Sequence, residues 1–321
     1  MVRLEAILPR KYTDDIETTA VYVATIKEKS QTKKVMDLLK EKYPMTTSLH
    51  HLKRVRNLNG DLHIILTTTN ETSTKEVFER DIDICHLLKD IRIGLVTSCP
   101  PLTRRQFTEA SKHWPVSFHE DKYITKLVEG KMFTERDVMF HERIFRIVDE
   151  TSRLAIGCNA MTSNAAVIVD PKEQKVLVAA FDCSIHFSPL YHSSMVAIDM
   201  VARLQGGGCY GDLTYKMAAD DGYLSLDLTS SQQTNDVTPP HSTREVLHDG
   251  YLCTGYDVYL SAEPCVMCAM SLLHSRVRRV FYMKGNKSTG GLGGVFTVHC
   301  EDSLNHHFEV FQVDMCGTNG S

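Results

Sequence analysis

Short apolar runs alternate with amphipathic stretches over residues 20–97, which predicts a mixed α/β unit. The first run is rich in β-branched residues, and Ser30 after it offers an N-cap for an amphipathic helix that stops before Pro44. Two further apolar runs flank Asn59-Gly60, a dipeptide that favours a tight hairpin turn. Besides that first helix, we predict strands at 20–26, 51–56, 63–68 and 91–96 and a helix at 73–89. The order βαββαβ predicts an N-terminal ferredoxin-like α+β domain.

Pro100-Pro101 ends this unit, because consecutive prolines interrupt both helices and sheet pairing. Residues 102–132 are predicted to be a linker that contains one short helix and Trp114, the only tryptophan. A second alternation of helices and strands follows, and a polar Gly/Ser/Thr-rich stretch interrupts it, which we interpret as a flexible insertion. The predicted parts are a domain at 1–101, the linker at 102–132, and a domain at 133–321 with its insertion at 205–252.

Composition excludes several classes of protein. The 321 residues are 42% hydrophobic and 24% charged, as expected for a globular chain of about two domains. No run approaches the roughly 20 apolar residues of a membrane span, and the first apolar stretch is too short for a signal peptide. Ten cysteines are too few for a disulfide scaffold of this length, so they are predicted to be buried thiols or metal ligands. We therefore expect an intracellular protein.

The net charge of −4 conceals an uneven distribution. Residues 1–132 carry 22 Lys and Arg against 18 Asp and Glu, a charge of +4. Residues 133–321 carry 14 against 22, a charge of −8, so the two parts sum to −4. The N-terminal part is therefore the one whose charge suits a polyanionic partner.

The sequence Pro264-Cys265-Val266-Met267-Cys268 follows a predicted strand and carries the strongest chemical signal. Proline favours the first position of a helix, which would place both cysteines on one face of its first turn. The free N–H groups and the dipole at that helix end favour the thiolate form, which binds metal. The pair is typical of half a zinc site, although a single C-x-x-C also occurs as two buried structural cysteines.

His192 is predicted to supply the other half. It stands at the start of a predicted helix, between a β-hairpin and the strand that leads into the cysteine pair. A lone histidine there could equally be a cap or a surface residue. One imidazole and two thiolates give zinc three protein ligands and leave a fourth position open. We therefore predict one Zn²⁺ bound by His192, Cys265 and Cys268.

This pattern resembles the zinc-dependent nucleobase deaminases, whose signature combines H-x-E with P-C-x-x-C. The run SAEPCVMCAMSLLHSRVRRVFY, from Ser261 to Tyr282, is similar to the corresponding segment of tRNA adenosine deaminases, including HSR after the helix. With the order helix, hairpin, helix ahead of it, the resemblance covers about residues 133–315. It implies a cytidine-deaminase-like three-layer α/β/α domain.

One position departs from the deaminase pattern. In active members the second residue after the metal-binding histidine is a glutamate that carries protons during the reaction, and here it is Ser194. A serine hydroxyl does not ionise near neutral pH, and general acid–base catalysis contributes about 10²- to 10⁴-fold per transfer. Glu263 is close in sequence, but active relatives carry an acidic residue there as well as the catalytic glutamate. We therefore expect no catalytic residue and no deaminase activity from this chain alone.

A zinc-retaining deaminase domain without this glutamate, preceded by a separate α/β domain, resembles one family. It is the non-catalytic subunit of the eukaryotic tRNA adenosine deaminase that makes inosine at the wobble position. HWPVSFHEDKY, MVAIDMVARLQ, YLCTGYDVYLS and LNHHFEVF fit that resemblance. It implies a heterodimer with a catalytic subunit, a tRNA partner, a structural zinc, no membrane, and a location in cytoplasm and nucleus. Two alternatives remain: an active deaminase with an unusual proton shuttle, and a zinc-stabilised RNA-binding scaffold.

Basic residues of the N-terminal part are the candidate RNA contacts. Such side chains would meet phosphates without reading sequence, which suits recognition of folded tRNAs by shape. Any one pair could equally be a solvated surface feature. The candidates are Lys33, Lys34, Lys53, Arg54, Arg56, Arg104 and Arg105.

Overall fold

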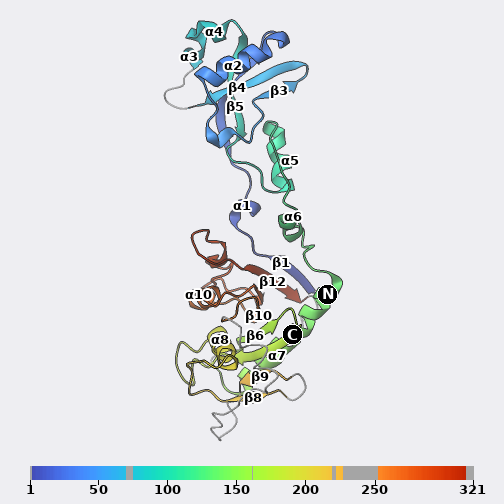
Figure 1. Ribbon diagram of the computed structural model, residues 1–321, viewed down its shortest axis with the longest axis vertical. Coiled ribbons are helices and arrows are strands. Elements are labelled where there is room, and N and C mark those ends of the chain that lie inside the picture. The colour runs from blue at the N-terminus through green and yellow to red at the C-terminus, as the bar shows by residue number, and fades with distance from the viewer. Residues whose placement is uncertain (1, 70–74, 161, 219–221, 227–251, 316–321) are drawn as a thin grey trace. The chain divides into compact units, whose positions relative to one another are not determined.

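The computed structural model describes residues 2–69, 75–160, 162–218, 222–226 and 252–315. The chain divides into two compact units, one formed by Arg10–Lys126 and the other by Met1–Pro9 together with Leu127–Ser321. Each unit has its own sheet (Figure 1). Among the residues that the structure describes, no helix is both long and apolar enough to cross a membrane.

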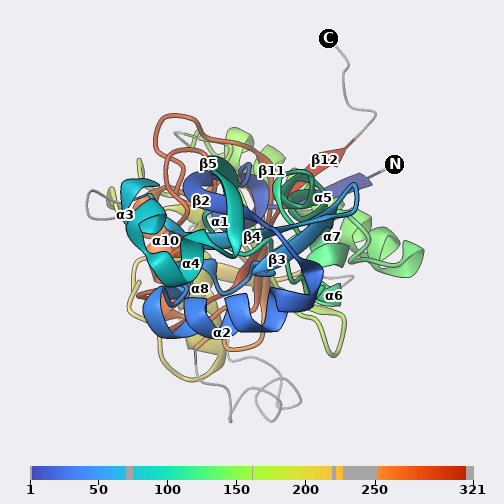
Figure 2. The same ribbon diagram turned by 90° about the horizontal axis from the view of Figure 1, so that it is seen from above.

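The smaller unit, Arg10–Lys126, contains a four-stranded antiparallel sheet with the order β3-β4-β2-β5. This strand order, with its helices after the first and third strands, is the predicted ferredoxin-like arrangement. The helices α2 and α4 lie beside these strands (Figure 2). The elements are α1 (Arg10–Thr13), β2 (Thr18–Ile26), α2 (Thr32–Lys42), β3 (Val55–Leu58), β4 (Asp61–Thr68), α3 (Lys75–Arg80), α4 (Ile82–Cys85), β5 (Leu88–Thr97), α5 (Arg104–His113) and α6 (Lys122–Val128).

The single helix predicted at 73–89 is in fact two helices, α3 and α4. Asp81 separates them in an extended conformation, and its carboxylate caps α4 by accepting the backbone N–H of Asp83. An N-capping aspartate therefore starts a new helix where apolar spacing alone predicted continuity.

Much of the predicted linker at 102–132 is part of the smaller unit rather than a connection between units. Thr103 caps α5 through a capping box with Gln106. After α5, Trp114 is buried in the core between the sheet and this helix, and its indole N–H donates to the carbonyl of Lys53 at 2.6 Å. Because a buried indole needs such a partner, this hydrogen bond fixes the segment to the sheet.

The larger unit contains an eight-stranded mixed sheet with the order β1-β12-β11-β10-β6-β7-β9-β8. The sheet is covered by α7 on one face, where Phe145 packs against Tyr259, and by α8 and α10 on the other. This is the predicted three-layer α/β/α arrangement. The elements are β1 (Val2–Ala6), α7 (Glu135–Gly157), β6 (Ala165–Asp170), β7 (Lys175–Phe181), α8 (Ser193–Leu204), β8 (Tyr215–Met217), β9 (Leu224–Leu226), β10 (Asp257–Ala262), α10 (Val266–His274), β11 (Arg279–Lys284) and β12 (Glu309–Met315).

One further prediction about the parts of the chain was wrong. The first residues were assigned to the N-terminal domain, but β1 pairs antiparallel with β12 and extends the sheet of the larger unit. The predicted insertion at 205–252 contributes β8 and β9 to the same sheet, where β9 pairs with β7. Residues 227–251 of that insertion lie outside the described residues. Strands this short have too little sequence pattern to be recognised without their partners.

Candidate metal centre

The two cysteines of the C-x-x-C motif lie at the start of α10, directly after β10. Cys265 is the N-cap residue of α10 in an extended conformation, and Cys268 lies in the first turn. Pro264 therefore precedes the cap. We had predicted that it occupies the first position of the helix. The consequence for the thiols is unchanged, because both sulfurs still lie at the N-terminal end of the helix.

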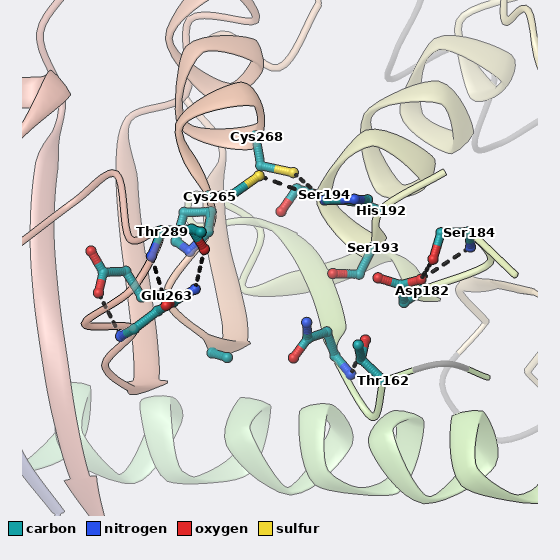
Figure 3. A pocket seen from close by; sticks show the side chains of 14 residues that line it. Thr162, Asp182, Ser184, His192, Ser193, Ser194, Glu263, Cys265, Cys268 and Thr289 are labelled. Carbon is teal, nitrogen blue, oxygen red and sulfur yellow. Dashed lines mark hydrogen bonds between the residues drawn. The ribbon is translucent and has the colours of Figure 1, made fainter. Parts of the chain in front are cut away.

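His192 approaches these sulfurs from the N-terminus of α8, where it is also an N-cap residue. Its Nδ1 lies 3.6 Å from Sγ of Cys265 and 3.5 Å from Sγ of Cys268 (Figure 3). The three ligand atoms all lie within 4.8 Å of one another. The structure thus brings together the three predicted ligands across 72 intervening residues of chain.

The spacing of these atoms fits a tetrahedral zinc site. With Zn–N near 2.0 Å and Zn–S near 2.3 Å, two ligands of a tetrahedral ion stand about 3.6 Å apart. The two measured N···S distances match that edge. The donor set of one imidazole and two sulfurs is also one that zinc prefers.

The two thiols influence each other's ionisation. A hydrogen bond from the Cys268 thiol is the main reason that the pKa of Cys265 falls to about 5. The same contact, followed by burial, raises the pKa of Cys268. The pair therefore releases one proton readily and retains the other.

Ser194 lies in the first turn of α8, two residues after His192, and is buried. Its hydroxyl lowers the pKa of the Cys268 thiol, against the larger effects of Cys265 and burial. It also lines a pocket of about 180 Å³ between α8, α10 and the ends of β6, β7 and β10. The residue at the position of the deaminase glutamate thus reaches the metal ligands but presents only a hydroxyl there (Figure 3).

Glu263, the nearest carboxylate in sequence, has a structural role. Its side chain is only 4% exposed and accepts the backbone N–H groups of Asn286 at 2.8 Å, Leu292 at 2.9 Å and Gly294 at 2.7 Å. These bonds hold the glycine-rich loop that follows β11 against the end of β10. A carboxylate with its oxygens occupied in this way is poorly placed to carry protons to a substrate.

Asp182 is a second buried carboxylate of the pocket, and the sequence analysis missed it. It follows β7 and accepts hydrogen bonds from the backbone N–H of Ser184 at 3.0 Å and from its hydroxyl at 2.5 Å. The only available signal was its position immediately after a buried strand, which by itself does not distinguish a pocket residue from a turn residue.

The structure gives several of the candidate RNA contacts other partners. Arg54 donates to main-chain carbonyls of Tyr43 at 2.5 Å, Ile65 at 3.2 Å and Leu66 at 3.2 Å, so its guanidinium holds α2 to the sheet. This structural use removes Arg54 from the exposed basic residues that were expected to meet phosphates.

Arg104 and Arg105 are neutralised, because Arg104 pairs with Glu120 at 2.6 Å and Arg105 with Asp15 at 2.5 Å. The remaining candidates are distributed over different elements: the exposed residues Lys33, Lys34 and Lys53, and Arg56, which is partly buried beside Trp114. Of the three candidates that are close together in sequence, Lys53, Arg54 and Arg56, only Lys53 is therefore exposed.

Two family models match the chain. Residues 139–284 match the cytidine and deoxycytidylate deaminase zinc-binding region, and residues 19–114 match the N-terminal domain of the tRNA-specific adenosine deaminase TAD3. The first match includes His192 and both cysteines, and the second falls within the smaller unit.

Curated relatives match nearly the whole chain. A zebrafish (Danio rerio) protein named probable inactive tRNA-specific adenosine deaminase-like protein 3 is 34% identical, over 95% of this chain and 90% of its own length. The fission yeast (Schizosaccharomyces pombe) tRNA-specific adenosine deaminase subunit tad3 is 29% identical, over 92% and 84%. A solved structure from a study of A-to-I editing by tRNA deaminases covers 54% of this chain and 98% of its own, with 15% identity and a TM-score of 0.37.

Proposed function

The chain belongs to the family of TAD3 and the inactive tRNA-specific adenosine deaminase-like protein 3, and on this premise we propose how it works. It is the non-catalytic subunit of a tRNA adenosine deaminase that converts the wobble adenosine of the anticodon to inosine. A separate subunit, which has the H-x-E glutamate, performs the reaction in a heterodimer with this chain. The present chain stabilises that complex and recruits tRNA.

The observation that carries this proposal is the chemistry of the pocket beside His192. Deamination needs a group that accepts a proton from the attacking water and delivers protons to the base and the departing amine. Ser194 cannot exchange protons in this way near neutral pH. The two carboxylates of the pocket, Asp182 and Glu263, are engaged by Ser184 and by the glycine-rich loop respectively. These contacts support a subunit that retains the deaminase fold without the reaction.

His192, Cys265 and Cys268 would hold one zinc ion. When bound, zinc supplies Lewis acidity at such a site and a strong bond to each ligand. In this chain the ligands lie at the N-terminus of α8 and at the N-terminus of α10, so a bound ion would stabilise the packing of these two helices on one face of the sheet. Its role would therefore be structural.

The smaller unit would contact the tRNA. Support comes from its match to the TAD3 N-terminal domain and from the positive charge of residues 1–132. The acidic larger unit is less suited to meet phosphates. This distribution of charge supports tRNA binding by the smaller unit and a different role for the deaminase-like unit.

Reconstitution tests the proposal directly. Inosine formation is measured on a tRNA transcript with this chain alone, the catalytic subunit alone, and both together. We expect activity only with both. Ser194→Ala in this chain should leave the rate of the complex within about twofold, because a hydroxyl that takes no part in proton transfer contributes little to the barrier.

Other outcomes identify the alternatives. Ammonia release by this chain alone, abolished by Ser194→Ala, would establish an active deaminase with an unusual proton shuttle. Full activity of the catalytic subunit without this chain, together with tRNA binding by this chain, would favour a zinc-stabilised RNA-binding scaffold.

A further inference from the structure

Three residues on β3, β4 and β5 of the smaller unit lie on the same face of the sheet as Trp114. In the strand register Arg56 of β3 lies opposite His63 of β4, and His63 lies opposite Thr25 of β2. On the other side of β2, Arg92 of β5 lies opposite Val23, whose side chain packs in the core with Trp114. Paired residues of a sheet point to the same face. We call Arg56, His63 and Arg92 the basic row.

No ion pair neutralises the two arginines of the basic row among the described residues. Neither arginine makes an ion pair there, whereas Arg104, Arg105 and Lys112 of the same unit are all paired with carboxylates. Arg56 also has a buried Nε without a hydrogen-bond partner in the described structure. The charge of Arg92 disfavours the charged form of Arg56, and an anion bound near both groups would relieve this repulsion.

The electrostatic effect on His63 agrees with this arrangement. Its pKa is lowered first by burial and then by the charges of Arg92 and Arg56. The acidic residues Asp61 and Asp90 oppose that effect and contribute less. At His63 the two arginines therefore outweigh the two carboxylates.

The members of the row differ in how firmly they are held. The Arg56 guanidinium lies 4.2 Å from the centre of the Trp114 ring, and its Nη1 donates to the carbonyl of His113 at 2.8 Å. Nδ1 of His63 is 3.1 Å from the hydroxyl of Thr25. Arg92 is exposed. A guanidinium that is already fixed loses little conformational entropy on binding, while an exposed arginine can move to complete the site.

We propose that the two arginines of the basic row bind the phosphate backbone of tRNA, with Arg56 as the fixed contact and Arg92 as the mobile one. This inference rests on the proposed function and names the residues by which the smaller unit carries it out. Guanidinium groups donate to phosphate oxygens without reading base edges, so the site recognises the shape of the RNA rather than its sequence. Arg92 and His63 were not among the sequence-based candidates.

Binding of the full-length chain to a tRNA transcript, measured by filter retention at several salt concentrations, tests the inference. Arg92→Gln is the main variant, because its exposed side chain can be replaced without disturbing the core. We expect about tenfold weaker binding. The slope of log affinity against log salt concentration should also be smaller in magnitude by about one, because one phosphate contact is lost. Arg92→Lys should retain most of the affinity.

Lys112→Gln provides a matched control, since it removes one positive charge from the same unit at a lysine that is already paired with Glu109. Its affinity should stay within about twofold of that of the unchanged chain. Arg56→Gln should weaken binding at least as much as Arg92→Gln, and thermal unfolding of this variant shows whether loss of the Trp114 contact contributes.

The results separate this inference from the proposed function. If the unchanged chain binds tRNA and Arg92→Gln binds equally well, the basic row is not the site, while the proposed function stands. Equal weakening by Arg92→Gln and Lys112→Gln would likewise show only a general effect of charge and overturn the site. If the unchanged chain does not bind tRNA, alone or with the catalytic subunit, the proposed function fails and this inference with it.

Discussion

His141 shows how one buried residue of α7 makes the stability of the larger unit depend on pH. Its Nδ1 is 2.9 Å from the hydroxyl of Tyr259, and its ring packs against Phe133 and Phe281. Burial in this aromatic cluster lowers its pKa from an ordinary value of 6.5 to about 4. The neutral ring is therefore favoured in the folded chain, and protonation favours unfolding.

Between pH 6.5 and pH 4 the unfolded chain binds a proton at His141 that the folded chain does not. The stability that His141 contributes is present above pH 6.5 and is lost progressively as the pH falls toward 4, by about 3 kcal/mol in total. We expect His141→Gln to show a smaller loss of unfolding free energy between pH 7 and pH 4.5, measured by urea denaturation. Equal losses in variant and unchanged chain would contradict this assignment. Comparing the two chains at each pH cancels the titration of the metal ligands.

At the scale of elements, the glycine-rich loop after β11 shows why this segment needs glycine at particular positions. A Cβ at Gly290 would lie 2.3 Å from the carbonyl oxygen of Asn286 and 2.4 Å from the carboxylate of Glu263. Glycine at position 290 therefore lets the loop pass close to Glu263, so that backbone N–H groups on both sides of it can reach the carboxylate. The fold uses the loop to anchor the end of β10, next to Cys265.

Gly290→Ala is expected to displace this loop, since neither the carbonyl nor the buried carboxylate can move away without breaking hydrogen bonds. We predict a loss of about 2–4 kcal/mol in unfolding free energy and faster release of zinc to a chelator, followed with a zinc-sensitive dye. Gly285→Ala is the matched control, because its Cβ would lie 3.7 Å from the nearest atom and fits without strain. Similar zinc release from both variants would refute this role of the loop.

At the scale of the whole molecule, the sheet of the larger unit is completed by the first strand of the chain. In β1 the side chains of Val2 and Leu4 are buried against this unit, and Nε2 of His299 lies 2.9 Å from the carbonyl oxygen of Ile7. The chain thus begins in the larger unit, forms the smaller unit, and returns. The two units are not successive segments of sequence.

Removal of residues 1–7 should therefore destabilise the deaminase-like unit rather than the smaller one. The loss of two buried side chains and of the pairing with β12 should cost at least about 3 kcal/mol and leave β12 as an open edge prone to aggregation. Calorimetry should show a lower apparent Tm for the unfolding of the larger unit. This transition is recognised because removal of zinc also lowers its Tm. The double variant Arg3→Ala with Glu5→Ala, which removes only exposed side chains of β1, should leave that Tm within about 2 °C. A lowered Tm of the other transition would contradict this assignment.

Local patterns account for the parts that the sequence predicted correctly. Apolar alternation and the Asn59-Gly60 turn gave the strands and hairpin of the smaller unit, because these features act over a few residues. The spacing of Cys265 and Cys268 at a helix start likewise indicated two of the three clustered ligands. His192 was found because a metal site requires more ligands than one C-x-x-C supplies.

By itself, therefore, the sequence determined most of the longer local elements, the fold class of each unit, the candidate zinc ligands and the serine at the glutamate position. Only the tertiary structure decided that β1 joins β12, that Trp114 and Arg54 hold the smaller unit together, that Glu263 anchors a loop, and that Arg92 lies near Arg56. The physical reason is the separation along the chain over which each effect acts. Propensity and periodicity act between neighbours in sequence, whereas strand pairing and the partners of buried polar groups depend on residues brought together from distant parts of the chain.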